Sequence, residues 1–310
     1  MQESAFFLET SDEKRIFVRT WHPTTNEAPL AVVQIAHGMA EHSARYRSFA
    51  AALTQQGIAV YANDHRGHGK TEEDPQNRGH FGDQDGWGSA IQDLFRLTAH
   101  IQKTHPNVPV FLFGHSLGSF LVRRAIQLNG KGIEGVILSG TGGDPGIQGK
   151  LGLWIANGII RKHGPKFRSA MIDHLIFGKY NRSFQPNRTS HDWLSRDERE
   201  VDKYVEDEGC GYVCTVGFIK DMIAGLIELH RKEQIEKIPK ELPLYLFSGS
   251  KDPVGKNGKA VVAVAEQYKK SGMEDVSYKL YKDGRHEMLN EVNREEVYRD
   301  VIQWMTSKTR

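Results

Sequence analysis

A serine lies in a G-x-S-x-G pattern at residues 114–118, which read Gly-His-Ser-Leu-Gly. The pattern directly follows the short apolar run Val110–Phe113 and precedes a stretch with helical spacing. Between a strand and a helix, the two glycines permit a turn that is too tight for Cβ atoms, and this turn lifts the serine hydroxyl above the end of the sheet. We therefore predict Ser116 as a nucleophile.

A serine hydroxyl becomes a good nucleophile at neutral pH only beside a base, and that base needs an orienting acid. Asp252 follows the apolar run Leu244–Phe247, and His286 follows the run Val276–Tyr281. The chain order serine, acid, histidine is the order expected around a G-x-S-x-G serine. We predict Asp252 as the acid and His286 as the base, while Asp144, which follows an earlier apolar run, stays open as an alternative acid.

The loop after the apolar run Leu30–Ala36 reads His-Gly-Met-Ala-Glu-His at residues 37–42. Around a G-x-S-x-G serine, backbone N–H groups after the third strand and directly after the nucleophile stabilise the oxyanion. Those donors would be the main-chain N–H groups of Met39 and Leu117. Gly38 would let the backbone approach the substrate closely.

The other polar residues near these loops are expected to support the structure rather than to react. Four of them are expected to brace the oxyanion loop: Glu41, His42, Arg45 and Tyr46. We also expect Asp64 and Arg66 to form a structural ion pair. The chain has no H-E-x-x-H motif, no P-loop and no G-x-G-x-x-G after its first strand, so we predict neither a metal nor a nucleotide or other cofactor.

Short apolar runs and stretches of helical spacing alternate along the chain. The apolar runs are Leu30–Ala36, Ile58–Ala62, Val108–Phe113, Val136–Leu138, Leu244–Phe247 and Val276–Tyr281. The helical stretches between them are Tyr46–Gln56, Ser89–Lys103, Leu117–Leu128, Gly258–Ser271 and Arg294–Thr306. This alternation predicts a mostly parallel sheet with helices on both faces. Two leading segments, Ala5–Glu9 and Arg15–Trp21, predict an antiparallel pair at one edge.

The alternation stops between about Asp144 and Cys214, where no strand pattern is found. Leu151–Arg161 and Ala170–Phe177 have helical spacing, whereas Arg182–Lys203 is polar and typical of a surface excursion. A helix near residues 215–230 then resumes the core. We expect a core of two parts, residues 1–142 and 215–310, with a helical cap inserted at residues 143–214.

The cap leaves the sheet one strand after Ser116 and returns before Asp252, so we expect it to cover the site on the carboxyl edge of the sheet. Its first helix carries an apolar stripe formed by Leu151, Trp154, Ile155 and Ile159. We predict that Trp154, Ile155 and Ile159 bind substrate as part of an acyl-binding cleft.

Composition narrows the class of protein. The 310 residues carry 41 Lys and Arg against 39 Asp and Glu, and this net charge of +2 gives no sign of a nucleic-acid partner. Two cysteines, Cys210 and Cys214, cannot form a disulfide framework. Acidic residues near the start and the lack of a long apolar segment favour a soluble, cytoplasmic protein.

The motifs at residues 37–42, 64–69, 114–118, 252–254 and 285–287, in this order, resemble the monoacylglycerol lipase and lysophospholipase branch of the α/β-hydrolases. The likeness covers about Leu30–Gly142 and Leu242–Thr306, whereas the insertion matches only in position and helical character. The resemblance implies an α/β-hydrolase fold and a serine esterase whose helical cap covers an acyl-binding cleft. It assigns Ser116, Asp252 and His286 as the triad, with Met39 and Leu117 as oxyanion donors.

The sequence thus predicts a serine carboxylic ester hydrolase that works through a covalent acyl-enzyme. Its partner would be a small-molecule acyl ester, such as a monoacylglycerol or a lysophospholipid, and the cap could contact a membrane surface transiently. A peptidase or thioesterase with the same triad is the alternative within enzymes, since fold and triad do not select the acyl bond. A non-catalytic binding protein of the same fold is the alternative outside them.

Overall fold

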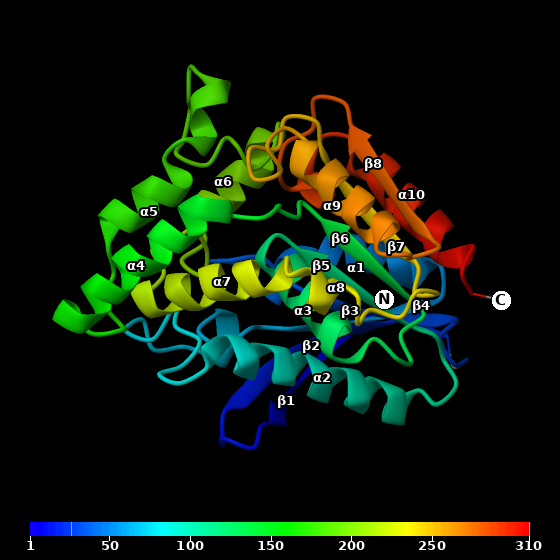
Figure 1. The fold of residues 1–310 in the computed structure, drawn as a ribbon. Helices are drawn as coiled ribbons and strands as arrows, with labels where there is room; N and C mark the ends of the chain where they lie inside the picture. Colours follow the sequence, from blue (N-terminus) through cyan, green and yellow to red (C-terminus); the bar gives the residue numbers. More distant parts are fainter. Residues whose placement is uncertain (26, 310) are drawn as a thin grey trace.

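The computed structural model describes residues 1–25 and 27–309. Asn26 and Arg310, which fall in the expected core ranges 1–142 and 215–310, lie outside the described residues. Eight strands form one sheet in the order β1-β2-β4-β3-β5-β6-β7-β8 (Figure 1). The strands are β1 (Gln2–Glu9), β2 (Arg15–His22), β3 (Ala31–Ala36), β4 (Ile58–Asn63), β5 (Val110–His115), β6 (Gly135–Ser139), β7 (Leu244–Gly249) and β8 (Val276–Tyr281).

The pairing of the strands explains their composition. From β4 through β8 every neighbouring pair is parallel, whereas β1 pairs antiparallel with β2 and β2 with β4. Strands β3 to β7 are buried along their whole length, which is why each reads as a continuous apolar run. The predicted mostly parallel sheet and its antiparallel edge are confirmed.

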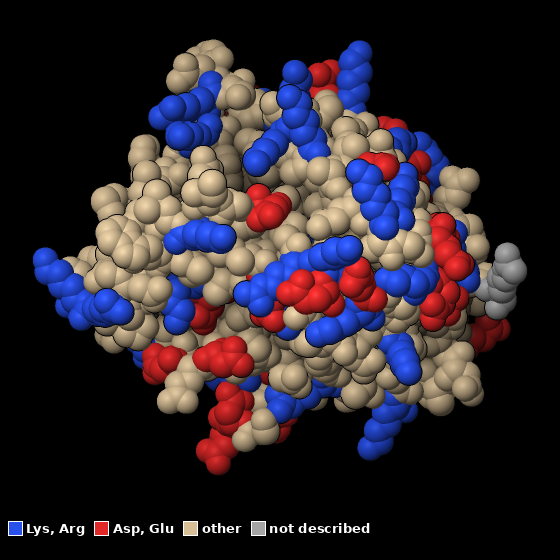
Figure 2. All heavy atoms as spheres, viewed as in Figure 1, with Lys and Arg blue, Asp and Glu red and all other residues tan. Residues whose placement is uncertain are grey.

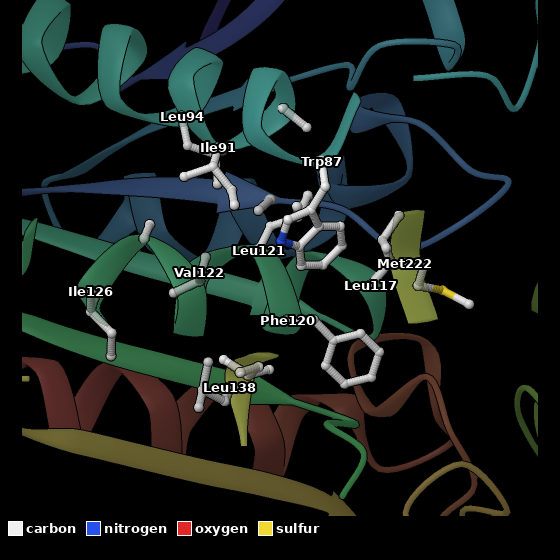
Figure 3. Close-up of a cluster of buried hydrophobic side chains, with 14 of the residues drawn as sticks. Trp87, Ile91, Leu94, Leu117, Phe120, Leu121, Val122, Ile126, Leu138 and Met222 are labelled. Carbon is white, nitrogen blue, oxygen red and sulfur yellow. The ribbon is translucent and has the colours of Figure 1, made fainter. Parts of the chain in front are cut away.

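Helices cover both faces of the sheet, as predicted. On one face α1 (Arg47–Gln55) and α10 (Arg294–Thr306) share a hydrophobic cluster with the strands. The other face carries α2 (Gly86–Thr104), α3 (Leu117–Asn129), α7 (Val216–Leu229) and α9 (Lys259–Lys270). There Trp87 of α2 packs with Leu117 and Phe120 of α3 and with Met222 of α7 (Figure 3). This cluster holds the start of α3, and with it the turn at Ser116.

The chain between β6 and α7 is helical and projects from the core (Figure 1). It contains α4 (Gly146–His163), α5 (Ala170–Phe177), the 3₁₀ helix η3 (Tyr180–Phe184) and α6 (Glu198–Glu206). The short helix α8 (Lys232–Ile235) follows α7, and the remaining 3₁₀ helices are η1 (Ser43–Tyr46), η2 (Gly69–Thr71) and η4 (Met288–Asn290). Among the described residues, no helix combines the length and apolar character needed to cross a membrane.

The first cap helix does not present the predicted apolar stripe as one face. The face of α4 that packs on α7 consists of small residues. A Cβ at Gly149 would contact Ile227 of α7, a Cβ at Gly152 would contact Ile223, and Ala156 is fully buried. Because small side chains let two helices approach closely, they form the buried face although they add little hydrophobicity to the pattern. Leu151 and Trp154 are consequently exposed, Trp154 by 74%, and the expectation that Trp154 lines a cleft is corrected.

Candidate active site

Ser116 occupies a strained turn between β5 and α3. Its backbone has φ 50° and ψ −117°, a conformation that non-glycine residues rarely adopt. Hydrogen bonds hold the turn, since the N–H of Ser116 donates to the carbonyl of Ser139 at 2.9 Å and the Ser119 hydroxyl donates to the Ser116 carbonyl. A Cβ at Gly118 would lie 2.0 Å from the Ala36 carbonyl oxygen, so the sharp turn requires glycine there.

His286 and Asp252 form a buried pair beyond the ends of β8 and β7. Nδ1 of His286 lies 3.0 Å from Oδ1 of Asp252, and both side chains are almost completely buried. The second carboxylate oxygen of Asp252 accepts from the Ser248 hydroxyl at 2.6 Å, and Oδ1 also accepts from the N–H of Val254 at 2.9 Å. These hydrogen bonds hold the carboxylate in place, so that it can orient the imidazole of His286.

The pairing raises the pKa of His286 and lowers the pKa of Asp252, so it favours the charged form of both side chains. Burial alone would lower the pKa of His286, but the neighbouring Asp252 carboxylate outweighs it and holds the pKa above its usual value. Burial alone would raise the pKa of Asp252, but the His286 charge and the hydrogen bonds from His286 and Ser248 hold it below its usual value. An imidazole beside an anion at neutral pH can accept a proton and keep it stabilised.

Ser116 and His286 both border the carboxyl end of β6. Ser116 is hydrogen-bonded to Ser139, and a Cβ on the next residue, Gly140, would lie 2.9 Å from Cε1 of His286. The ring of His115 lies 4.8 Å from the ring of His286, centroid to centroid. The three predicted triad residues therefore gather at one edge of the sheet.

The alternative acid lies elsewhere. Asp144 is exposed, and its carboxylate accepts from the N–H of Gly146 at 2.7 Å at the start of α4. It forms no hydrogen bond with His286 among the contacts of the described residues. Its position is that of a local turn residue.

The predicted oxyanion loop passes directly in front of Ser116. A Cβ at Gly38 would lie 3.4 Å from Cβ of Ser116 and 2.7 Å from a Glu41 carboxylate oxygen, so the close approach of this loop requires glycine. Within the described ranges, neither the main-chain N–H of Met39 nor that of Leu117 donates to a protein acceptor. Both groups are available to bind a developing negative charge.

A buried network braces this loop, as predicted. Glu41 accepts from the Gly38 N–H at 2.5 Å, from the Tyr46 hydroxyl at 2.8 Å and from Arg45 at 2.7 Å. Arg45 also donates two parallel hydrogen bonds to Glu287 at 2.6 and 2.7 Å. Burial would raise the pKa of Glu287, but the Arg45 guanidinium lowers it to about 2. The network thus joins the oxyanion loop to the residue that follows His286.

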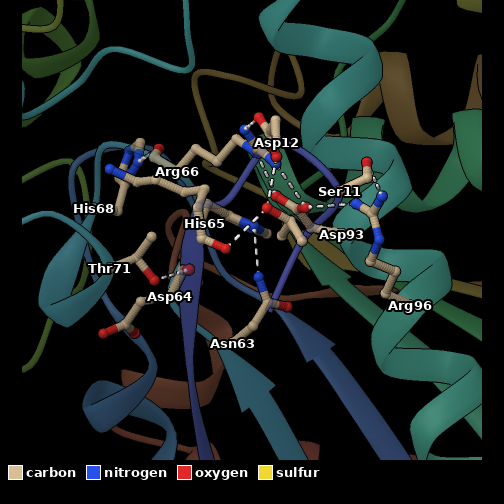
Figure 4. A network of polar contacts seen from close by, with 12 residues as sticks. Ser11, Asp12, Asn63, Asp64, His65, Arg66, His68, Thr71, Asp93 and Arg96 are labelled. Carbon is tan, nitrogen blue, oxygen red and sulfur yellow. Dashed lines mark hydrogen bonds and ion pairs between the residues drawn. The ribbon is translucent and has the colours of Figure 1, made fainter. Parts of the chain in front are cut away.

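The expected pair of Asp64 and Arg66 is wrong. Arg66 instead forms ion pairs with Asp93, at 2.6 Å, and with Asp12, at 2.5 Å (Figure 4). Asp64 accepts from two backbone N–H groups, those of Ser43 at 2.7 Å and Lys70 at 2.8 Å. Both residues have structural roles, but Arg66 binds two carboxylates and Asp64 binds backbone N–H groups.

The stretch Arg182–Lys203 is only in part the surface excursion that its polarity suggested, since Arg182–Ser190 is mostly exposed but the segment after it is not. Leu194 and Ser195 are buried, and the indole of Trp193 packs on His286 with the ring centroids 5.1 Å apart. Sequence reasoning missed Trp193 as a site residue. The signal that could have found it is the apolar pair Trp193-Leu194 in an otherwise polar run.

One cluster has ligand types that could hold a metal ion. Donor atoms of His42, Asp207 and Cys210 all lie within 4.8 Å of one another. His42 and Asp207 already pair at 2.8 Å, which ties the oxyanion loop to the cap, and burial raises the pKa of the Cys210 thiol. The hydrogen bond between His42 and Asp207, which braces the loop, explains why these residues lie together.

The mostly parallel sheet, its flanking helices and the serine turn define the α/β-hydrolase fold, and the chain is a serine hydrolase. The family model described as serine aminopeptidase, S33, matches residues 27–293. The chain belongs to this family.

Two relatives and one solved structure are similar to this chain over nearly its whole length. Human monoglyceride lipase is 26% identical over 310 residues, which cover 97% of this chain and 90% of the relative. A monoacylglycerol lipase of Mycolicibacterium smegmatis is 29% identical over 94% of this chain and 93% of its own. The structure of a thermostable carboxyl esterase from Bacillus coagulans in complex with glycerol matches all of both chains at 27% identity, with a TM-score of 0.92.

Proposed function

We propose that the protein is a carboxylic ester hydrolase acting on monoacylglycerols, lysophospholipids or similar single-acyl esters through Ser116, Asp252 and His286. The observation that carries the proposal is the strained turn at Ser116 beside the buried His286–Asp252 pair. The names of the lipase and esterase relatives support the choice of an ester over other acyl bonds.

The proposed reaction has two halves. Ser116 Oγ attacks the ester carbonyl while His286 takes its proton, and the N–H groups of Met39 and Leu117 stabilise the oxyanion. His286 then passes the proton to the departing alcohol, which leaves an acyl group on Ser116. In the second half His286 takes a proton from water, the hydroxide attacks the acyl-enzyme, and the proton returns to Ser116 as the acid is released. Asp252 holds the imidazole in the required tautomer throughout.

The acyl-binding role is proposed for the inner side of the cap. Ile155 and Ile159 are half-buried and pack against the main hydrophobic cluster, unlike the exposed Trp154. If an acyl chain lies against such residues, each buried methylene should contribute about 0.8 kcal/mol, or about fourfold in kcat/KM, until the cleft ends. A series of esters of increasing chain length measures this directly.

The outer side of the cap is proposed to contact membranes transiently. Large apolar side chains on α4 and α5 are exposed: Ile147, Leu151, Trp154, Met171 and Leu175. Arg161 and Lys162 follow at the end of α4, and Figure 2 shows that this side consists mostly of residues other than Lys, Arg, Asp and Glu, with basic side chains at its edge. An apolar patch rimmed by basic groups suits the surface of a lipid layer. The cytoplasmic location stays a prediction.

A peptidase is the second candidate, because the description of the matching family names an aminopeptidase. The experiment that separates the candidates is a substrate panel of monoacylglycerols, lysophospholipids, short esters, thioesters and aminoacyl amides, run on the wild type and on Ser116→Ala. We expect ester turnover with an initial burst in the wild type, and a loss of several powers of ten in Ser116→Ala. Faster cleavage of aminoacyl amides than of every ester would reject the proposal in favour of the peptidase.

A further inference from the structure

One segment of the cap is fastened to the loop that carries His286. We call this segment, Asp192–Arg196, the strap. The N–H of Glu287 donates to the carbonyl of Leu194 at 2.7 Å, and the N–H of His286 donates more weakly to that of Trp193 at 3.4 Å. Main-chain bonds of this kind fix the strap relative to the histidine itself, whatever side chains surround it.

Side chains reinforce the same junction. Arg285 donates to the carbonyls of Asp192 and Ser195, and its guanidinium lies over the ring of Phe184, 4.3 Å from the centroid. Arg196 pairs with the fully buried Glu291 at 2.9 Å, and Glu291 also accepts from the N–H of Arg285 at 2.9 Å. The strap is therefore a fixed part of the site, in contrast to α4 and α5, whose outer sides are exposed.

The strap places the indole of Trp193 against His286. The two ring centroids lie 5.1 Å apart with the planes at 38°, and Tyr180 packs on the indole at 5.0 Å and 61°. Asp252 holds only the Nδ1 edge of the imidazole, and one hydrogen bond leaves the ring free to tilt about that edge. Trp193, together with Gly140 and His115, limits this tilt by contact with the rest of the ring.

We propose that Trp193 is a positioning residue, which holds the faces of the His286 ring so that its Nε2 is directed at Ser116. The inference rests on the proposed function for its catalytic consequence, but the ring contact is independent of it. A flat aromatic ring is what this role requires. A branched aliphatic side chain would fill the space without restraining the tilt.

The kinetic test compares an aliphatic with an aromatic replacement of Trp193. Trp193→Leu should lower kcat by about 10²-fold on a soluble nitrophenyl ester, because a shift of about 1 Å in a reacting group has this effect, with KM changed much less. Trp193→Phe should restore kcat to within about threefold of the wild type. Val205→Ala, at an exposed position on α6, is the matched cap control and should leave both constants unchanged. A folded Trp193→Leu enzyme with wild-type kcat would overturn the proposal.

A fluorescence titration tests the contact without any catalysis. The chain has five tryptophans, and among the aromatic pairs of the described residues Trp193 is the one that packs on a histidine ring. A protonated imidazole quenches the fluorescence of an indole that it contacts. The charged or titratable groups around His286 are Asp252, Glu287, Glu41 and His115. We expect emission to fall as the pH drops through the His286 titration, and this step to vanish in both Trp193→Phe and His286→Gln.

The two readouts separate failure of this proposal from failure of the proposed function. A wild type that shows the fluorescence step but no burst on any ester would reject the ester hydrolase while keeping the contact. A wild type that shows the burst, with an identical fluorescence step in Trp193→Phe, would reject the role of Trp193 and leave the proposed function standing.

Discussion

Arg45 lies between two buried carboxylates, and its replacement by Met should expose how much that arrangement contributes to stability. The guanidinium lowers the pKa of Glu287 from 4.5 to about 2 against the opposing effect of burial. Removal of Arg45 leaves Glu41 and Glu287 buried without their partner, which is the costly way to break a buried ion pair. Because such a loss typically costs about 3–5 kcal/mol, we expect Arg45→Met to lose about that much unfolding free energy at pH 8.

The sign of the pH dependence follows from the same shift. In the wild type, Glu287 has a lowered folded-state pKa, so its contribution is present above pH 4.5 and is lost as the pH falls toward about 2. In Arg45→Met the buried Glu287 carboxylate, without the guanidinium beside it, binds a proton at higher pH than in the wild type. The stability difference between the two proteins should consequently shrink as the pH is lowered from 8 to 5.

Urea unfolding at pH 8 and pH 5 measures this difference. Arg47→Met is the matched control, because Arg47 is a neighbouring arginine whose side chain is 68% exposed and pairs with Glu3 at the surface. An exposed pair of this kind contributes at most about 1 kcal/mol. The reasoning is refuted if Arg45→Met is no less stable than Arg47→Met, or if its deficit is the same at both pH values.

Three further outcomes are expected. Asp252→Asn should lower kcat by about 10³–10⁴-fold while Asp144→Asn changes it little, and the reverse ranking would transfer the role of the acid. The acidic limb of kcat/KM should have its midpoint above 6.5, because Asp252 raises the pKa of His286 and the reaction needs the neutral imidazole; a midpoint below 6.5 would contradict the pairing. Trp154→Ala should slow hydrolysis of monoacylglycerol in anionic vesicles but not of a soluble acetate ester, since its indole is exposed; equal losses on both would mean that it only supports the fold.

The local patterns of this sequence were sufficient for the fold and for the position of its candidate triad residues. Gly114 and Gly118 around Ser116 determine the turn, because no other residue avoids the backbone contacts that a Cβ would make there. Asp252 and His286 follow apolar runs, and in a parallel sheet the ends of such strands meet at one edge. Because each of the three residues follows a strand, its place in the sequence indicated its place at this edge of the sheet. The gathering of the three residues was therefore predictable.

Contacts between segments far apart in the chain were decided only by the tertiary structure. Arg66 pairs with Asp12 and Asp93, because those carboxylates, and not the one two residues away, lie within reach of the guanidinium. Helix α4 turns its small residues inward because α7 can approach them closely, a preference that a hydrophobic pattern does not record. Trp193 stands in a polar stretch, and it reaches His286 because main-chain hydrogen bonds dock the strap on the histidine loop. Backbone groups pair without regard to side-chain type, so the apolar pair Trp193-Leu194 marked the segment in the sequence but not the loop on which it docks.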